Sequence, residues 1–236
     1  MPSVGAKWCL LMDGLCELVN ADAWIWALGC QMEDGKQPVY TSFLHGGFTE
    51  ERFARYCTAI EHPDMAWLSA PILREIQARQ SHLTRLRQQM DEKNLFLTSD
   101  AFPLWSAADI GPIILSLRPL REQTVGCMAL YRGKEKPLFD ERESRIAHII
   151  LSEVPWLHEQ GWPEDRGISV PNLSPRLRLI LNILLDGRSR KDISNHLAIS
   201  ENTVSGYQKT IYRHFGVNSH AALMRRFQQG DGGDQA

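Results

Sequence analysis

Three serines divide the C-terminal part of the sequence into short helical segments. Ser174, Ser189 and Ser200 each stand directly before a stretch in which apolar residues recur at helical spacing. A serine at this position accepts a hydrogen bond from a backbone N–H of the first helical turn, which otherwise has no partner. Gly187 and Gly216 end the first and third stretches, since glycine tolerates the backbone conformation found just after a helix. The region 173–227 is therefore predicted to form four short helices.

The apolar residues of these segments lie on one side of each predicted helix, because residues three or four apart share a helix face. The predicted inward positions are Leu177, Ile180, Leu181, Leu184, Ile193, Leu197, Val204, Ile211 and Phe215. The rest of the surface of the third helix, within 201–215, is left to polar and basic side chains.

Charge is unevenly distributed along the 236 residues. The net charge is −2, yet 173–227 contains nine Lys and Arg against three Asp and Glu, a balance of +6, so the remainder carries −8. A chain of this length can form a larger and a smaller domain. We predict a domain over 1–160, a linker over 161–172, which contains proline, glycine and charged residues, and a basic helical domain over 173–236.

A tight turn between two helices, the second of which presents polar and basic groups, is the helix-turn-helix geometry that places a recognition helix in the DNA major groove. The segment resembles the LuxR-type (NarL/FixJ-type) DNA-binding domain in "LSPR", "LLDGRSRKDIS", "LAISENTVSGY" and "IYRHFGV". The resemblance implies that the third helix enters the groove and that the fourth, near 219–227, joins two copies in a homodimer. The positions that it assigns to DNA contact are Lys191, Ser200, Asn202, Thr203, Ser205, Tyr207, Lys209 and Arg213.

Several positions depart from the family pattern. Leu177 stands where the family has Glu, which replaces a polar contact by packing, and Ser205 stands where a lysine is common. Tyr207 replaces a frequent histidine, and two roles stay open for it: donating its hydroxyl to a phosphate, or packing. Gly206 weakens the recognition helix by about 1 kcal/mol relative to alanine.

The N-terminal region is predicted to be an α+β domain. The pattern indicates a helix from about Trp8, strands near 23–31 and 38–45, helices after Thr49 and over 64–90, strands near 111–120 and 124–132, and a helix after Asp140. This order describes an antiparallel sheet with packed helices. It resembles GAF- and PAS-like sensor domains over about 6–160. The fold class is therefore an α+β GAF/PAS-like sensor domain followed by an all-α four-helix helix-turn-helix domain.

A group of aromatic residues in the N-terminal region could line a small-molecule pocket, since such pockets are largely apolar. These candidates are Trp24, Trp26, Tyr40, Phe43, Trp67 and Trp105. For each of these residues taken singly, a place in the ordinary core is favoured, but some are expected to border a cavity if the domain is a sensor. The Trp/Tyr/Asp/Trp set of acyl-homoserine-lactone receptors does not align with the sequence, so this ligand is not assigned.

No feature of the sequence indicates catalysis or a cofactor. It contains no nucleophile–base set, P-loop or dinucleotide fingerprint, and His148 and His158 are too far apart in sequence to form a metal site. The five cysteines form no CxxC pair, which favours reduced thiols and, without an apolar run of membrane length, a cytoplasmic protein that does not contact membranes.

The leading hypothesis is therefore a transcriptional regulator, not an enzyme, that binds double-stranded DNA as a dimer. Its N-terminal domain would respond to a small-molecule or protein effector. The alternative is that a ligand-binding or catalytic N-terminal module carries the main function and that DNA binding is weak or auxiliary.

Overall fold

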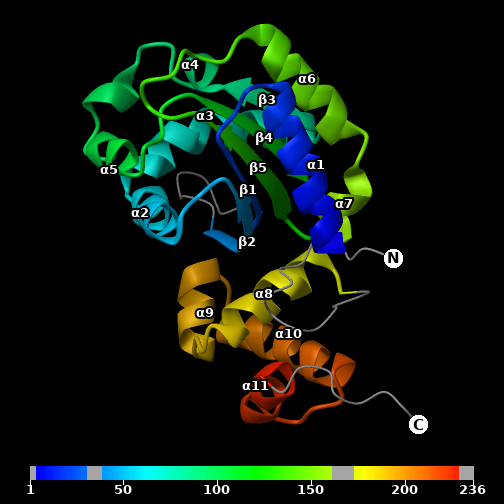
Figure 1. The fold of residues 1–236 in the computed structure, drawn as a ribbon. Coiled ribbons are helices and arrows are strands. Elements are labelled where there is room, and N and C mark those ends of the chain that lie inside the picture. The colour runs from blue at the N-terminus through cyan, green and yellow to red at the C-terminus, as the bar shows by residue number, and fades with distance from the viewer. Residues whose placement is uncertain (1–3, 31–38, 161–172, 229–236) are drawn as a thin grey trace.

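The computed structural model describes residues 4–30, 39–160 and 173–228 (Figure 1). The predicted linker, 161–172, lies outside the described residues. The N-terminal elements are α1 (Val4–Leu18), β1 (Ala23–Cys30), β2 (Val39–Gly46), α2 (Glu50–Ile60), α3 (Asp64–Arg79), β3 (Leu83–Leu86), α4 (Arg87–Met90), η1 (Leu95–Thr98), α5 (Phe102–Ala107), β4 (Ile113–Pro119), β5 (Thr124–Tyr131), α6 (Glu141–Ser152) and α7 (Pro155–Gln160). The C-terminal elements are α8 (Pro175–Leu185), α9 (Arg190–Leu197), α10 (Glu201–His214) and α11 (His220–Gln228). The predicted α+β and all-α fold classes are confirmed.

The N-terminal part is built on a five-stranded antiparallel sheet with the strand order β2-β1-β5-β4-β3. Side chains alternate between the two faces of a strand. Trp24 and Trp26 therefore point to one face, where Trp26 lies 5.6 Å from Trp8 of α1 between ring centroids, and Ile25 points to the other. Helices α1, α6 and α7 cover the first face, and α2, α3 and α5 lie over the second (Figure 1).

The prediction of one helix over 64–90 is wrong. Helix α3 ends at Arg79, Gln80 adopts a left-handed conformation with φ of 48°, and the chain then forms β3 beside β4. Thr84 pairs with Ser116 in this ladder, and Leu86 is buried against the sheet. The hydrogen bonds of a sheet come from a strand that is distant in sequence, so local helical periodicity does not reveal them. The short helices η1 and α5 were not predicted either.

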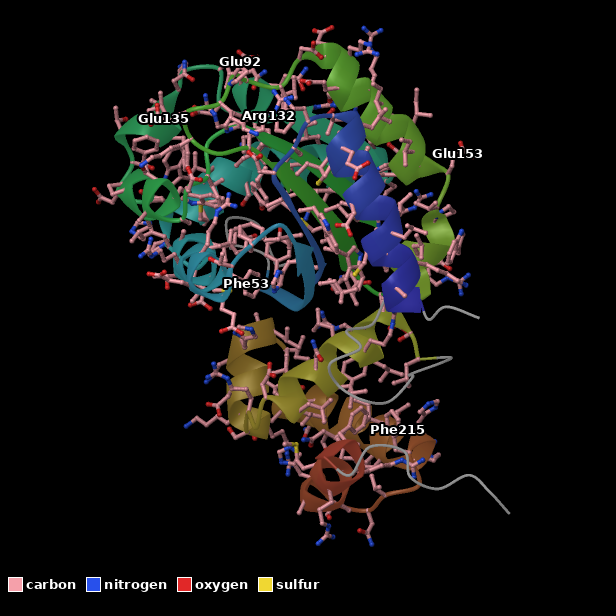
Figure 2. All side chains as sticks on the ribbon, viewed as in Figure 1. Phe53, Glu92, Arg132, Glu135, Glu153 and Phe215 are labelled. Carbon is pink, nitrogen blue, oxygen red and sulfur yellow. The ribbon has the colours of Figure 1, made fainter. Side chains whose placement is uncertain are left out.

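Arg132, which directly follows β5, ties several elements together (Figure 2). The residue is 3% exposed, and its guanidinium donates hydrogen bonds to the carbonyl oxygens of four residues, Val19, Asn20, Pro137 and Leu138, at 2.7–3.2 Å. It also pairs with Glu143 Oε1 of α6 at 2.5 Å and lies over the Phe139 ring, 3.9 Å from its centroid. One buried cation therefore joins the end of α1, the loop after β5, and α6.

Glu143 completes this arrangement at the start of α6. Its second carboxylate oxygen accepts the backbone N–H of Asp140 at 2.8 Å, while the Asp140 side chain accepts the N–H of Glu143 at 2.8 Å. This reciprocal capping box confirms the predicted cap at Asp140. The predicted cap at Thr49 is also confirmed, since its hydroxyl accepts the N–H of Arg52 at 3.2 Å.

All three serine caps of the C-terminal part are confirmed. The hydroxyls of Ser174, Ser189 and Ser200 each accept the N–H of the residue three positions later, at 3.1–3.4 Å. The predicted inward residues form one core, in which all are buried except Leu177, which is partly buried. These caps and this core hold α8, α9, α10 and α11 together.

Helix α8 also contacts the N-terminal part, where it lies against β1 and β2 (Figure 1). The Ser174 hydroxyl donates to Glu122 Oε2 at 2.6 Å, and the Arg178 guanidinium, 1% exposed, donates to the Glu159 carbonyl. A helix that is buried on nearly all sides packs against two different neighbours. Helix α8 is therefore both a core helix of the C-terminal part and the contact with the sheet.

None of the helices that the structure describes is long and apolar enough to cross a membrane.

Replacing Arg132 by methionine is expected to lower the free energy of unfolding by about 3 kcal/mol, because Glu143 then lies largely buried without its cationic partner. Urea unfolding followed by circular dichroism measures this change. The matched control is Arg142→Met on the exposed side of α6, for which a change within about 0.5 kcal/mol is expected. Equal losses for both variants would contradict the role of Arg132.

Candidate functional site

The connection between α9 and α10 is short and well fixed. Ala198 ends α9 in a left-handed conformation with φ of 48°, and the Ser194 hydroxyl donates to the Ile199 carbonyl at 2.6 Å. Ser200 then caps α10. Because Val204 and Ile211 are buried in the C-terminal core, the rotation of α10 about its own axis is set, and its polar side faces outward.

The structure brings the sequence-predicted DNA-contact residues onto this helix pair. Those that are exposed are Lys191, Ser200, Asn202, Thr203, Lys209 and Arg213. Ser205 is half-buried. Tyr207 is also half-buried and packs against the C-terminal core, which favours the packing role of the two that the sequence left open. Contact of these residues with DNA stays a prediction.

The start of α10 gathers groups that can bind an anion. The Ser200 and Thr203 hydroxyl oxygens lie 2.8 Å apart, so the two side chains fix each other's position at the first turn. A helix start presents backbone N–H groups and a positive dipole end, which favour phosphate. Farther along α10, Lys209 and Arg213 supply cationic donors in the exposed surface.

Residues 171–227 match the family model described as "Bacterial regulatory proteins, luxR family". This segment belongs to the luxR family. The luxR-family segment covers α8, α9, α10 and α11, and its helix-turn-helix is the α9–α10 unit described above. No match was found among curated proteins.

Three solved structures are similar over longer stretches at low identity. Escherichia coli SdiA is 16% identical with a TM-score of 0.46 and covers 98% of this chain and 92% of its own. The VqsR LBD domain from Pseudomonas aeruginosa is 17% identical with a TM-score of 0.43, covering 65% and 85%. CepR2 from Burkholderia cenocepacia, an N-acylhomoserine lactone dependent LuxR family transcription factor, is 12% identical with a TM-score of 0.42, covering 66% and 83%. These identities and TM-scores are too low to assign a ligand or a residue role to this chain.

A cavity of about 100 Å³ lies on the second face of the sheet, beneath α2, α3 and α5. Most of its wall is apolar. The lining residues include Ile25, Ala27, Tyr40, Tyr56, Ile60, Met65, Leu68, Phe96, Trp105, Ile113, Leu115, Cys127, Ala129 and Tyr131.

The cysteine and tyrosine side chains of this wall stay uncharged at neutral pH. Burial raises the pKa of Cys127 to about 12 and raises the pKa values of Tyr40, Tyr56 and Tyr131 well above their usual range. The Tyr131 hydroxyl donates to the Tyr56 hydroxyl at 3.3 Å, which partly satisfies these two polar atoms within the wall.

One ion pair borders the cavity. Arg87 and Asp91, one helical turn apart, approach to 3.8 Å, and both side chains are largely buried. The Asp91 carboxylate also accepts the backbone N–H groups of Leu95 and Phe96, each at 2.8 Å. Asp91 therefore pairs with Arg87 and also holds the start of η1. Sequence reasoning missed this pair because it placed 87–91 at the end of a solvated helix.

The aromatic pocket candidates are separated by the structure. Tyr40 and Trp105 line the cavity, whereas Trp24 and Trp26 lie on the opposite face of the sheet, packed against α1. Trp24 and Trp26 therefore do not line this cavity, contrary to the prediction, because the alternation of side chains along β1 points them to the other face of the sheet. Trp67 is 42% exposed and does not line the cavity, and the Phe43 side chain lies outside the described residues.

Replacing Gly206 by alanine is expected to stabilise α10 by about 1 kcal/mol, because glycine weakens a helix interior. A Cβ at this position would meet no atom within 4 Å. Hydrogen–deuterium exchange of the α10 amides should slow by about fivefold.

Gly216→Ala provides the matched comparison for this variant. A Cβ there also meets no atom, but φ is +64°, so alanine should destabilise the end of α10. Faster exchange in Gly206→Ala would contradict the assignment of Gly206 to an unstrained helical position.

Proposed function

We propose that this protein is a transcriptional regulator that binds double-stranded DNA as a homodimer through α10, under the control of a sensing N-terminal domain. The observation that carries the proposal is the luxR-family helix-turn-helix with a capped, outward-facing α10. In this proposal the C-terminal part binds DNA, and the N-terminal part binds an effector that controls DNA binding.

The proposed DNA contact follows from the donors on α9 and α10. Hydroxyls, helix-start N–H groups and cationic side chains position a protein on phosphates, and contacts to base edges choose the sequence. The balance of +6 over 173–227 attracts DNA, while the balance of −8 over the remainder opposes nonspecific binding by the rest of the molecule. DNA thus approaches the C-terminal helices.

A dimer would place two copies of α10 in successive turns of the major groove, with half-sites about 10 base pairs apart. Helix α11 is the element proposed to join the copies. It carries its apolar side chains, among them Leu223 and Met224, toward the core of its own domain, so the contact between copies would use its outer surface.

The apolar cavity is the proposed ligand site of the N-terminal domain. Its tyrosine and cysteine side chains are neutral at physiological pH, and the charges of Arg87 and Asp91 at its border are already paired with each other. Bringing a charged ligand into such a site costs free energy unless a partner is available. We therefore propose a neutral, largely apolar small molecule as the effector.

The proposed route from sensor to DNA runs through α8. This helix contacts β1 and β2, and the cavity is lined by Ile25 and Ala27 of β1. A ligand that changed the position of β1 would change the surface on which α8 rests. The coupling free energy would then appear as a ligand-dependent DNA affinity, and reciprocally as a DNA-dependent ligand affinity.

Lys209→Gln and Arg213→Gln are each expected to weaken DNA binding and to reduce the slope of log affinity against log salt by about 1, because each removes one phosphate contact. The DNA is the fragment that the parent protein enriches from host genomic DNA, and fluorescence anisotropy gives the affinity at several salt concentrations.

Lys93→Gln is the control for charge. It removes one exposed cation from the N-terminal part, far along the chain from α10, and should leave the slope unchanged. If the parent protein enriches no discrete motif, or if all three variants behave as the parent does, α10 does not read DNA and the regulator proposal fails.

A series of 1-alkanols tests the cavity. Thermal stability should rise with alkanol chain length until the cavity is filled, because a ligand that binds only the folded state stabilises it. Sodium alkanoates of the same lengths should stabilise the protein much less. In the variant Ala129→Leu the larger side chain narrows the cavity, so the longest alkanol that still stabilises the protein should have a shorter chain. Equal stabilisation by alkanoates would contradict a site for neutral ligands.

A further inference from the structure

A second hollow, of about 470 Å³, lies between α6 and β3, the strand at the edge of the sheet. Figure 1 shows α6 beside this strand, on the side of the sheet away from α2 and α5. The hollow shares no lining residue with the apolar cavity, and its lining is mainly polar: Arg79, Ser81, His82, Leu83, Thr84, Arg85, Gln89, Glu141, Ser144, Arg145 and His148. We call it the edge cleft.

The floor of the edge cleft is a fixed chain of hydrogen bonds. His82 Nε2 lies 2.7 Å from the Ser116 hydroxyl, and its Nδ1 lies 2.8 Å from the Ser152 hydroxyl. Thr84 Oγ1 lies 2.9 Å from the Ser116 hydroxyl and 3.0 Å from His148 Nδ1. Both ring nitrogens of His82 are thus engaged, and burial lowers its pKa to about 4, so it supports the cleft as a neutral positioning residue.

Helix α6 lines the opposite wall with one stripe of side chains. Glu141, Ser144, Arg145 and His148 follow at helical spacing and therefore share a face. Because His148 Nδ1 is held by Thr84, the ring has a fixed orientation, and its Nε2 makes no hydrogen bond to any residue that the structure describes. The Ser144 hydroxyl likewise has no partner within the described ranges, although the residue is only 8% exposed.

Cationic groups outnumber acidic ones in this cleft. Arg79 and Arg85 both pair with Glu75, which compensates part of their charge. Arg145 is exposed and forms no ion pair within the described part of the chain; its only hydrogen bond there is a 3.4 Å contact from Nε to the Glu141 carbonyl. The two terminal nitrogens of its guanidinium are therefore available as donors, in the fork geometry that fits oxyanions.

We propose that the edge cleft binds the oxyanion group of a small polar molecule, a phosphate or a carboxylate, with Arg145 and Ser144 as donors. Both side chains lie on the face of α6 that lines the cleft, and the hydrogen-bonded floor fixes the His148 ring beside them. The bound anion would brace α6 against β3. This site is separate from the proposed DNA-binding and ligand sites and does not depend on either.

Isothermal titration of the full chain, at constant ionic strength in a phosphate-free buffer, tests the proposal with inorganic phosphate in one arm and succinate in the other. Saturable binding is expected in at least one arm, which then identifies the oxyanion. Arg145→Gln should weaken that binding on the order of tenfold, since hydrogen bonds to charged groups are among the stronger ones. Ser144→Ala should weaken it less, and both variants should keep the parent's melting temperature.

The matched control is Arg142→Gln, which removes an exposed arginine from the same helix but outside the cleft lining. It should bind as the parent does. Absence of saturable binding in both arms, or equal weakening by Arg142→Gln and Arg145→Gln, would overturn the proposal. DNA binding by the same variants is a separate readout, so a failure here is distinguishable from a failure of the regulator proposal.

Discussion

The buried guanidinium of Arg132 is the interaction on which the N-terminal part of the structure depends. It satisfies four backbone carbonyls and one carboxylate from three separate stretches of chain. Those carbonyls lie where α1 ends and where the loop after β5 turns, places at which a regular helix or sheet supplies no donor. Burial of a charge is tolerated there because each guanidinium nitrogen donates to at least one acceptor and the group lies over the Phe139 ring. Helices α1 and α6 are thereby fixed on the same face of the sheet.

The two faces of the sheet are packed differently. Trp24 and Trp26 are buried beneath α1, α6 and α7 on the first face, whereas the apolar cavity lies on the second face, under α2, α3 and α5. The edge strand β3 contributes the floor of a third environment, which is polar. One sheet thus separates a tightly packed face, an apolar cavity and a polar cleft, and α8 contacts it at β1 and β2. A change in any of these environments can reach the C-terminal helices through such contacts.

The sequence predicted interactions between residues close together in the chain and missed interactions between distant ones. The caps at Ser174, Ser189, Ser200, Thr49 and Asp140 were predicted because each depends on residues three positions apart. Strand β3 was missed because its ladder partner, β4, lies about thirty residues away, and the local pattern resembles a helix. The ion pair of Arg87 and Asp91 was missed for the same reason, since its burial comes from the surrounding sheet and η1.

The sequence by itself determined the helix-turn-helix: spacing, caps and charge are local properties, and they specify the outward side of α10 without knowledge of the rest of the chain. It also determined that Trp24 and Trp26 share a face. Only the tertiary structure decided which face that is, because the choice depends on the helices that cover the sheet, and these are joined to it through long-range contacts such as those of Arg132. The cavity and the edge cleft are likewise spaces between distant segments, and a space of this kind exists only once the segments are packed.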